Sequence, residues 1–491
     1  MAETVRERLR SILFLFPAAL ARLGIVDRET GIEAFDLAVP VMVTGALRTV
    51  LRTADFFMVS LALGPAAVAG LQFGFQYFFI AFGLSLSVSS GTISVVSRLH
   101  GAGEYTRANL AIKQSLWLAI AISVPIVVAG WIWAESLIDL LTDDPRVIAL
   151  GATYLKIIML SAPFRFWGMV GSRALAGAGD TQTPMYVRAT TVPTNIALNA
   201  VLIFGLGPAP RLGIAGAAIG TAIANTLAAT IFSVLLLSGR FAVGLNVGGT
   251  QFDRDIVREI ARVGIPLSGT RLAQTFGRFP FLFVLGVLGT NVVAAYAIGR
   301  RLVMLAMMPA WGYSTASSTL VGQAIGSGGY AEAENYGWQS VRIALATQLS
   351  IAALLSLTAR PLALLFDAET VALTVEFIYV FAGMIAGYSV ARTLRGALRG
   401  AGDTRFPLYG TVLGYYLVRL PIAALALPAG IVISGFGVSV TPGLGLGLVA
   451  VYVAIWADNY TRAAVNWLRF RSDRWKAIAR TGTAQASAEG D

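Results

Sequence analysis

Long apolar runs separated by short polar segments make up most of the sequence. Residues 116–130 and 343–358 are apolar nearly all the way around when they are drawn as helices, whereas a helix on a soluble protein keeps its apolar residues in one stripe. A run of about 20 apolar residues is long enough to cross a membrane as a helix. The pattern therefore predicts an all-α polytopic membrane protein in which most of the chain lies in lipid.

The apolar runs and the breakers between them predict about 12 transmembrane helices. The spans are expected at residues 35–62, 67–98, 107–130, 146–174, 183–206, 213–238, 257–288, 292–324, 333–358, 370–398, 406–429 and 443–468.

An internal repeat organises these spans. Residues 177–184 read GAGDTQTP and residues 400–407 read GAGDTRFP, and Pro40 in LAVP corresponds to Pro266 in VGIP. A duplicated unit of roughly 225 residues holds six spans. Because six is even, the second copy enters the membrane in the same direction as the first. The sequence therefore predicts two parallel six-helix repeats around a central cleft.

Five segments follow from this organisation. Basic residues before residue 11, followed by an apolar run that Pro17 interrupts, favour an amphipathic helix on the membrane surface over a cleaved signal peptide. Residues after about Arg471 are small and polar, which favours disorder. The expected segments are a cytoplasmic amphipathic N-terminal segment (1–34), an N-lobe with helices 1–6 (35–238), a cytoplasmic linker (239–256), a C-lobe with helices 7–12 (257–468) and a disordered cytoplasmic tail (469–491).

The distribution of charge fixes the expected orientation. The net charge is +11, and the basic residues gather in alternate connections, at 6–10, 98–113, 240–262, 392–405 and 462–480, with basic-poor connections between them. This is the positive-inside pattern, so we expect a multi-pass protein of the cell membrane with both termini in the cytoplasm. The basic balance thus reflects topology, and we expect no nucleic-acid partner.

Composition also limits the chemistry. The chain has no cysteine and one histidine, so thiolate and histidine ligands for a metal site are lacking. No nucleophile motif occurs in a suitable context, which argues against an enzyme. We expect no metal and no cofactor, and a protein that acts as a monomer in the lipid bilayer on a small-molecule substrate.

The repeated GAGDT motif is expected to be structural. Glycine favours the left-handed conformation that ends a helix, while Asp or Thr caps the next helix and proline fits its first turn. The residues assigned to these turns are Gly177, Asp180, Thr181, Gly400, Asp403 and Thr404.

Together, three features resemble the multidrug and toxic compound extrusion (MATE) family, part of the wider multidrug/oligosaccharidyl-lipid/polysaccharide exporter superfamily. They are the duplicated GAGDTxxP, the opening LAVP followed by TADFFMV, and NIALNAVLIFG before GIAGAAIGT. The resemblance covers residues 36 to 467. It implies a twelve-helix secondary active exporter that exchanges cytoplasmic cationic or amphipathic compounds for protons or sodium ions by alternating access.

Asp55 is the main candidate for ion coupling. An ionisable group inside a membrane helix is costly and is a functional candidate by default, and the resemblance implies that an Asp in the TAD motif couples the ion. Asn195 and Asn199 lie four residues apart and share one helix face. The resemblance adds them, with Thr221, to the same site. The alternatives are an ion pair of Asp55 with Arg48 or Arg52 and, for the amides, plain interhelical hydrogen bonding.

The second repeat lacks the acids that sodium-coupled relatives carry, because Gln274 and Tyr388 stand at those positions. A hard cation needs several oxygen ligands. Proton coupling is therefore expected, with sodium at Asp55, Asn195, Asn199 and Thr221 as the alternative.

Arginines are frequent within the predicted spans. Residues expected to reach the cleft or the substrate are Arg48, Arg52, Gln274, Arg278 and Tyr388, and further arginines within the spans are Arg271, Arg342 and Arg419. Some of these arginines can instead extend to the membrane interface. A positive cleft suits carboxylates and phosphates, so the alternative function is a flippase for lipid or lipid-linked oligosaccharide.

The topology is directly testable. Tags placed after Asp491 and within residues 239–249 should both be accessible only from the cytoplasm, because both positions follow an even number of spans. The measurement is labelling of the tags in intact and in permeabilised cells. Labelling of either tag in intact cells would rule out the parallel arrangement.

Overall fold

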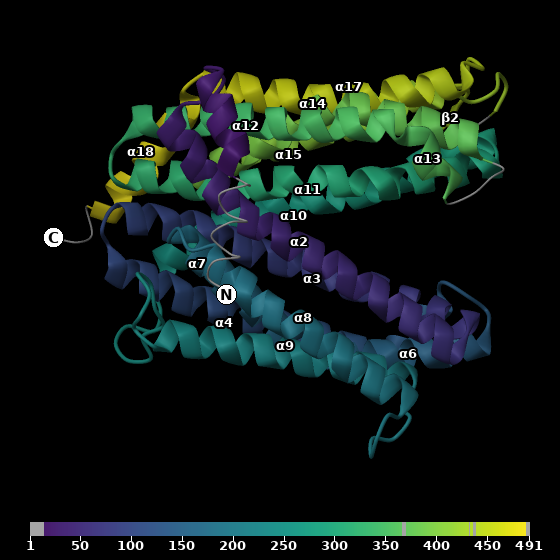
Figure 1. Cartoon of the computed structure of the whole chain (residues 1–491), viewed down its shortest axis with the longest axis horizontal. Coiled ribbons are helices and arrows are strands. Elements are labelled where there is room, and N and C mark those ends of the chain that lie inside the picture. Colours follow the sequence, from purple (N-terminus) through teal and green to yellow (C-terminus); the bar gives the residue numbers. More distant parts are fainter. Residues whose placement is uncertain (1–13, 366–369, 432, 436–437, 488–491) are drawn as a thin grey trace. The chain divides into compact units, whose positions relative to one another are not determined.

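A computed structural model of the chain describes residues 14–365, 370–431, 433–435 and 438–487, and these are nearly all helical. The helices of the first repeat are α2 (Arg28–Leu63), α3 (Pro65–Gly101), α4 (Tyr105–Ile132), α5 (Ala134–Asp139), α6 (Pro145–Leu160), α7 (Ala162–Gly177), α8 (Gln182–Phe204) and α9 (Ile214–Leu237) (Figure 1).

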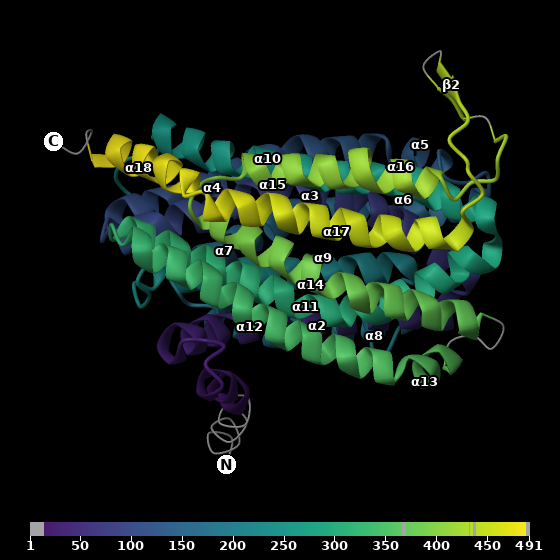
Figure 2. The same cartoon turned by 90° about the horizontal axis from the view of Figure 1, so that it is seen from above.

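The second repeat has the matching series. Its helices are α10 (Arg254–Leu288), α11 (Thr290–Gly326), α12 (Tyr330–Leu357), α13 (Ala359–Leu364), α14 (Val371–Gly400), α15 (Arg405–Val412), the π-helix η1 (Leu413–Arg419), α16 (Leu420–Ala424), α17 (Gly447–Arg471) and α18 (Arg474–Ser487). The short strands β1 (Ile433–Gly435) and β2 (Val438–Val440) pair antiparallel before α17. Helices α14 and α17 pack side by side (Figures 1 and 2).

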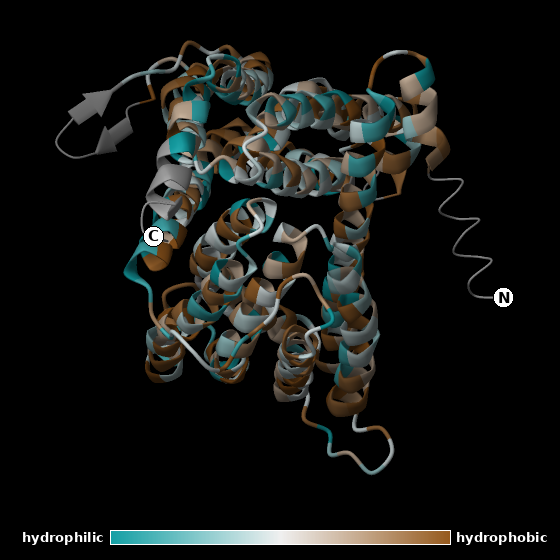
Figure 3. Cartoon of the chain, turned by 90° about the vertical axis from the view of Figure 1, so that its left-hand side faces the viewer, coloured by the Kyte–Doolittle hydropathy of each residue, from teal (hydrophilic) through white to brown (hydrophobic). Residues whose placement is uncertain are grey.

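The expected all-α membrane architecture with two repeats is confirmed. Among the described helices, seven are long and apolar enough to cross a membrane, or up to nine if each bent pair forms one span. Hydrophobic residues predominate along the helices (Figure 3). Helices such as α10 and α17 carry more charged residues, which lowers their hydropathy. They nevertheless occupy the predicted seventh and twelfth spans.

Two spans are bent, which the apolar pattern did not predict. The predicted fourth span divides into α6 and α7, which meet at 48° around Ser161. The eighth span, α11, bends by 46° between residues 290–304 and 306–326. Pro163 and Pro309 lie just after these bends. A proline inside a helix removes one backbone hydrogen bond and displaces the preceding turn, so both bends have a local cause.

Contacts divide the chain into two compact units. The first-repeat unit comprises Pro40–Ser268 and Gly326–Gly328, and the second-repeat unit comprises Met1–Val39, Gly269–Ile325 and Gly329–Asp491. The first helix of each repeat is therefore shared, because α2 begins in the second-repeat unit and α10 begins in the first-repeat unit. The lobe limits expected from the sequence, 35–238 and 257–468, assign each of these helices to one lobe only.

Close backbone contact holds the start of α10 in the first-repeat unit. A Cβ on Gly91 of α3 would collide with the Ile260 carbonyl, and one on Gly264 would collide with the Ser87 carbonyl. An ion pair of 2.6 Å joins Arg98 to Glu259 beside this contact. The glycines thus let the backbones of α3 and α10 come into direct contact.

The start of α2 is held in the second-repeat unit by α12. The backbone N–H of Asp27 donates to Gln339 at 2.9 Å, and the Tyr336 hydroxyl donates to Glu33 at 2.7 Å. Helix α2 begins at Arg28, so the predicted N-terminal segment ends earlier than residue 34. Its first 13 residues lie outside the described part of the chain.

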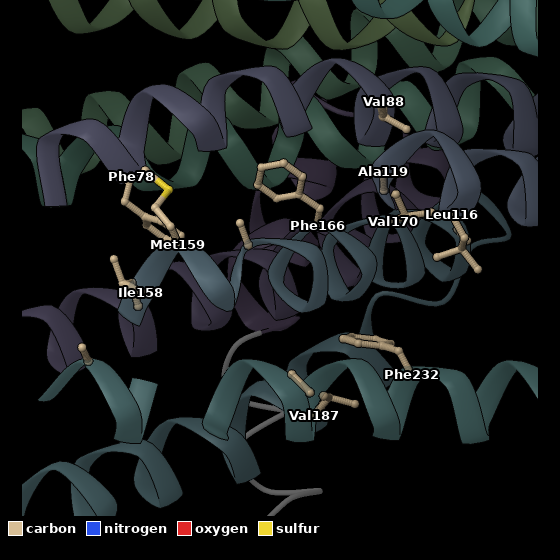
Figure 4. Packing of buried hydrophobic residues seen from close by; sticks show 14 of the residues in the cluster. Phe78, Val88, Leu116, Ala119, Ile158, Met159, Phe166, Val170, Val187 and Phe232 are labelled. Atoms are coloured by element: carbon tan, nitrogen blue, oxygen red, sulfur yellow. The ribbon is translucent and has the colours of Figure 1, made fainter. Parts of the chain in front are cut away.

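An apolar core fixes the helices of the first-repeat unit. Phe166 of α7 and Phe232 of α9 are fully buried, and they pack in one cluster with Phe78 of α3 and Met159 of α6 (Figure 4). Gly171 leaves room for the ring, since a Cβ there would lie 2.9 Å from Phe232. This core sets the positions from which the polar side chains of α2, α7 and α8 project.

The expected disordered tail is wrong for the described residues up to Ser487, because these form the end of α17 and α18. Trp475 is fully buried, stacks on Phe470 with ring centroids 5.0 Å apart and donates to the Phe470 carbonyl at 2.8 Å. Lys476 pairs with Glu334 of α12 at 2.6 Å. Composition alone could not reveal these contacts with other helices.

Substitution of Gly264 by leucine should destabilise the protein, because the new side chain must separate α3 from α10. Overpacking of this kind costs about 1–3 kcal/mol, so the melting temperature of the detergent-purified protein should fall by several degrees. Gly286→Leu is the matched control on the same helix, since a Cβ at Gly286 meets nothing within 4 Å. Equal melting temperatures for both variants would contradict the close contact.

Candidate functional site

The structure places Asp55 of α2 against Asn199 of α8. The Asn199 Nδ2 group donates to Asp55 Oδ1 at 2.7 Å, and Asn199 is fully buried. Asp55 is the only acidic residue in the sequences of α3, α4, α6 to α9 and the portion of α2 within this unit. A charged carboxylate in lipid is costly without partners, so this hydrogen bond marks the polar centre of the first repeat.

The amides next to Asp55 keep unused acceptors. Asn195 and Asn199 are both buried on one face of α8, and the Oδ1 atom of each is without a hydrogen-bond partner among the described residues. Gly220 of α9 sits directly against the Asn199 side chain. Thr221 follows it in a half-buried position, and in the described part of the chain its hydroxyl makes no hydrogen bond to Asp55. The predicted group therefore has one direct contact, Asp55 to Asn199.

The alternative in which Arg48 pairs with Asp55 is not seen: the described residues contain no ion pair between the two. Arg52 is exposed, and its guanidinium lies 4.3 Å from the centroid of the Phe75 ring.

Three arginines of the first-repeat unit lie close together. Arg48 of α2, Arg165 of α7 and Arg188 of α8 are near enough for their charges to repel one another. Arg165 donates to Asn225 Oδ1 at 3.4 Å, and its guanidinium is 5.3 Å from the Phe82 ring centroid. Arg165 and Arg188 were not predicted from the sequence, although each interrupts an apolar run, which is the signal that identified Arg48.

The second-repeat unit contains a buried acid that was also missed in the sequence. Asp458 of α17 is fully buried and pairs with Arg462 at 2.7 Å and with Arg419 of η1 at 3.5 Å. Gly414 of η1 lies against the carboxylate, since a Cβ there would be 2.6 Å from Asp458 Oδ1. π-helical turns often occur at functional positions. The signal in the sequence was a lone acid within the apolar run at 447–468.

The other residues expected near the substrate are dispersed within this unit. The Tyr388 hydroxyl accepts from Trp311 at 2.7 Å, and Arg271 is near Tyr388 and Arg392. Gln274 is half-buried and Arg278 is exposed. Arg342 is exposed on α12. The structure thus brings Tyr388 together with Arg271, and Arg419 with Asp458.

The two GAGDT segments form turns, but the conformational roles differ from those expected. The left-handed backbone occurs at the second glycine, Gly179 and Gly402, with φ of 95° and 81°. The first glycine, Gly177 or Gly400, ends the preceding helix. A Cβ at Gly400 would lie 2.5 Å from the Ser318 carbonyl, and one at Gly177 would lie 3.1 Å from the Ile93 carbonyl.

The acids of these turns then differ between the two repeats. Asp180 accepts from the Thr183 backbone N–H at 2.9 Å, as a cap does, whereas Asp403 pairs with Arg469 at 2.6 Å. Thr181 and Thr404 are buried directly before α8 and α15.

Within the described residues no group of three or more His, Cys, Asp and Glu side chains could hold a metal ion. The carboxylates of Asp55 and Asp458 have amide and guanidinium partners instead.

Comparisons with known proteins identify related chains. Residues 40–201 and 266–425 match the MatE family. The probable multidrug resistance protein NorM of Bradyrhizobium diazoefficiens is 28% identical over 90% of this chain and 93% of its own. An FAD transporter of Shewanella oneidensis is 26% identical over 71% of this chain and 77% of its own. The solved structure of a multidrug resistance MATE family transporter in an outward-facing conformation is 23% identical, with a TM-score of 0.82 over 92% of this chain and 97% of that one.

Loss of the Asp458 charge should destabilise the second-repeat unit. Asp458→Asn leaves Arg419 and Arg462 without their shared carboxylate, and removing one partner of a buried pair costs about 3–5 kcal/mol. The melting temperature in detergent should fall by several degrees. Glu135→Gln is the control: it breaks an exposed pair with Lys156 and should leave the melting temperature unchanged. An unchanged value for Asp458→Asn would show that its pairs contribute nothing to stability.

Proposed function

Because the chain belongs to the MatE family of membrane transporters, we propose that it is a secondary active exporter that moves amphipathic compounds out of the cytoplasm in exchange for protons. The chain is a transporter and not an enzyme. Export of varied compounds is supported by the relative named as a probable multidrug resistance protein. The cargo site is proposed to open alternately to the two sides of the membrane.

The hydrogen bond between Asp55 and Asn199 is the observation that carries the proposal. An acid held by an arginine stays ionised, because its charge is compensated. Asp55 instead has a neutral amide as its partner, and this partner brings no opposite charge that would hold the carboxyl group in its ionised form. A carboxyl group of this kind can alternate between protonated and ionised forms as its exposure to water changes.

The same geometry favours a proton over sodium. A sodium ion at Asp55 would need several oxygen ligands, whereas Asn199 presents its N–H group to the carboxylate. An amide is oriented by the hydrogen bonds that it can make. Beside an ionised carboxylate the amide presents its N–H group, because the carboxylate only accepts hydrogen bonds. Sodium bound by Asp55, Asn195, Asn199 and Thr221 remains the alternative.

A second candidate, a flippase for lipid or lipid-linked oligosaccharide, is favoured by the arginines that have no acidic partner among the described residues. The relative named as an FAD transporter supports a phosphate-bearing cargo in this family, since FAD contains a diphosphate. Net efflux of a soluble compound separates the exporter from a protein that only moves lipid between leaflets.

Asp55→Asn should abolish efflux driven by a pH gradient, because the amide cannot release a proton, while cargo binding in detergent is retained. The measurement is efflux of a fluorescent amphiphile from proteoliposomes under an imposed pH gradient. Asp139→Asn, which changes an exposed acid on α5, is the control and should transport normally.

A parallel assay with a sodium gradient at constant pH separates the two ions. Efflux driven by the sodium gradient but not by the pH gradient would replace the proton with sodium. Efflux by Asp55→Asn at the rate of the unmodified protein would remove Asp55 from the mechanism.

A further inference from the structure

The three arginines of the first-repeat unit form a centre of uncompensated positive charge. Among the described residues, Arg48, Arg165 and Arg188 have no carboxylate within ion-pair distance, and Arg188 is only 7% exposed. Their charges also act on one another unfavourably. Charges removed from water are expensive unless they are paired. Such an arrangement is stabilised by an anion that all three residues share.

Hydrogen bonding at this centre is also incomplete. The Nε group of each of the three arginines is buried and has no hydrogen-bond partner in the described part of the chain. The Thr191 hydroxyl, one turn after Arg188 on α8, is buried and unpartnered in the same way. An unsatisfied buried donor is costly. The missing partner is therefore a group with several acceptor oxygens.

We propose that Arg48, Arg165 and Arg188 bind the phosphate or carboxylate group of an amphipathic cargo. Guanidinium groups bind these oxyanions through paired N–H donors, and they do so more strongly than neutral donors. This inference names the cargo class of the exporter proposed above and rests on that function. It favours the anionic cargo class over the cationic one.

Aromatic rings beside the arginines supply a surface for the apolar part of the cargo. The Arg165 guanidinium lies 6.0 Å from the Phe78 ring centroid and 5.3 Å from that of Phe82. Phe79, which is 45% exposed, stacks on Phe82 with centroids 5.7 Å apart. A flat apolar group can lie on the Phe79 and Phe82 rings while its anionic end reaches the arginines.

The arginines and the proposed proton site are connected through one face of α8. Arg188, Thr191, Asn195 and Asn199 follow one another at intervals of three and four residues, and all four are buried. Arg188 and Asn199 are eleven residues, about 16 Å, apart along α8, and Arg48 and Asp55 are seven residues, about 10 Å, apart along α2, so Asp55 and the cargo anion occupy distinct positions in the same unit.

Direct repulsion between Asp55 and the anion is small at this separation. Two unit charges roughly 10–16 Å apart interact by about 1–2 kcal/mol at an effective dielectric constant near 20. Exchange must therefore arise because proton and cargo favour different conformations of the unit. A membrane potential that is negative inside drives protons inward and anions outward. The potential therefore favours both the entry of the proton and the exit of the anionic cargo.

The test compares matched probes in detergent, without any proton gradient. Binding of 1-naphthyl phosphate, of its cationic counterpart 1-naphthyltrimethylammonium, and of dihexanoyl phosphatidic acid is measured by calorimetry. The unmodified protein should bind at least one phosphate probe and prefer 1-naphthyl phosphate to the ammonium compound. Binding of the soluble phosphate indicates a soluble cargo, and binding of phosphatidic acid alone indicates a lipid headgroup; each supports the site.

Arg188→Gln should weaken phosphate binding roughly tenfold or more, as expected for loss of a charge-assisted hydrogen bond. The phosphate affinity of Arg188→Lys should lie between those of the unmodified protein and Arg188→Gln, because lysine keeps the charge but loses the guanidinium fork. Arg240→Gln is the control. Arg240 is exposed in the linker after α9, so this variant should bind the phosphate probe normally.

Melting temperatures separate a binding role from a structural one. Without probe, Arg188→Gln should melt at the same temperature as the unmodified protein or higher, because a buried unpaired charge has been removed. A structural arginine would give a lower value, which would contradict the proposal, as would equal phosphate affinity in Arg188→Gln or preference for the ammonium probe. Since binding is measured without a gradient, failure here leaves the Asp55 transport assay unaffected, and failure of that assay leaves this binding unaffected.

Discussion

The cost of placing charge where water is scarce governs the polar interior of this protein. The structure meets that cost at two acidic residues and leaves it unmet at one group of arginines. Asp55 is hydrogen-bonded to an amide, Asp458 is shared by two arginines, and Arg48, Arg165 and Arg188 are left with unsatisfied Nε donors among the described residues. Each arrangement has its own consequence, since a neutral partner permits a change of protonation, a paired acid fixes helices, and arginines without a carboxylate attract an anion.

Glycine determines how these polar groups come together. Gly220 allows α9 to pack on Asn199, and Gly414 allows η1 to pack on Asp458. Gly91 and Gly264 bring the start of α10 against α3, so α10 begins in one compact unit and continues in the other. Helix α2, which carries Asp55, is divided in the same way. Each of these two helices therefore belongs to both units over different parts of its length.

The sequence predicted those site residues whose signal is local. Asp55 stands out as an acid in an apolar run, and the four-residue spacing of Asn195 and Asn199 puts both on one buried face of α8. Asp458, Arg165 and Arg188 carry the same local signal, but a single arginine in a predicted span can also extend to the interface, and a single charge does not reveal its partner. Their significance lies in neighbours from other helices, such as Arg419 for Asp458, and no spacing along one helix reveals these.

The sequence by itself determined the solvent, the helical class, the duplication and the family, because these depend on composition, on runs of about 20 apolar residues and on motifs that recur along the chain. Only the tertiary structure decided where helices bend and which charged side chains form pairs. It also decided that the described tail forms the helix α18, with Trp475 buried. The physical reason is the separation along the sequence over which each interaction acts. Hydropathy and capping act between near neighbours in sequence, whereas the partner of a buried charge is chosen by packing between helices that are distant along the chain.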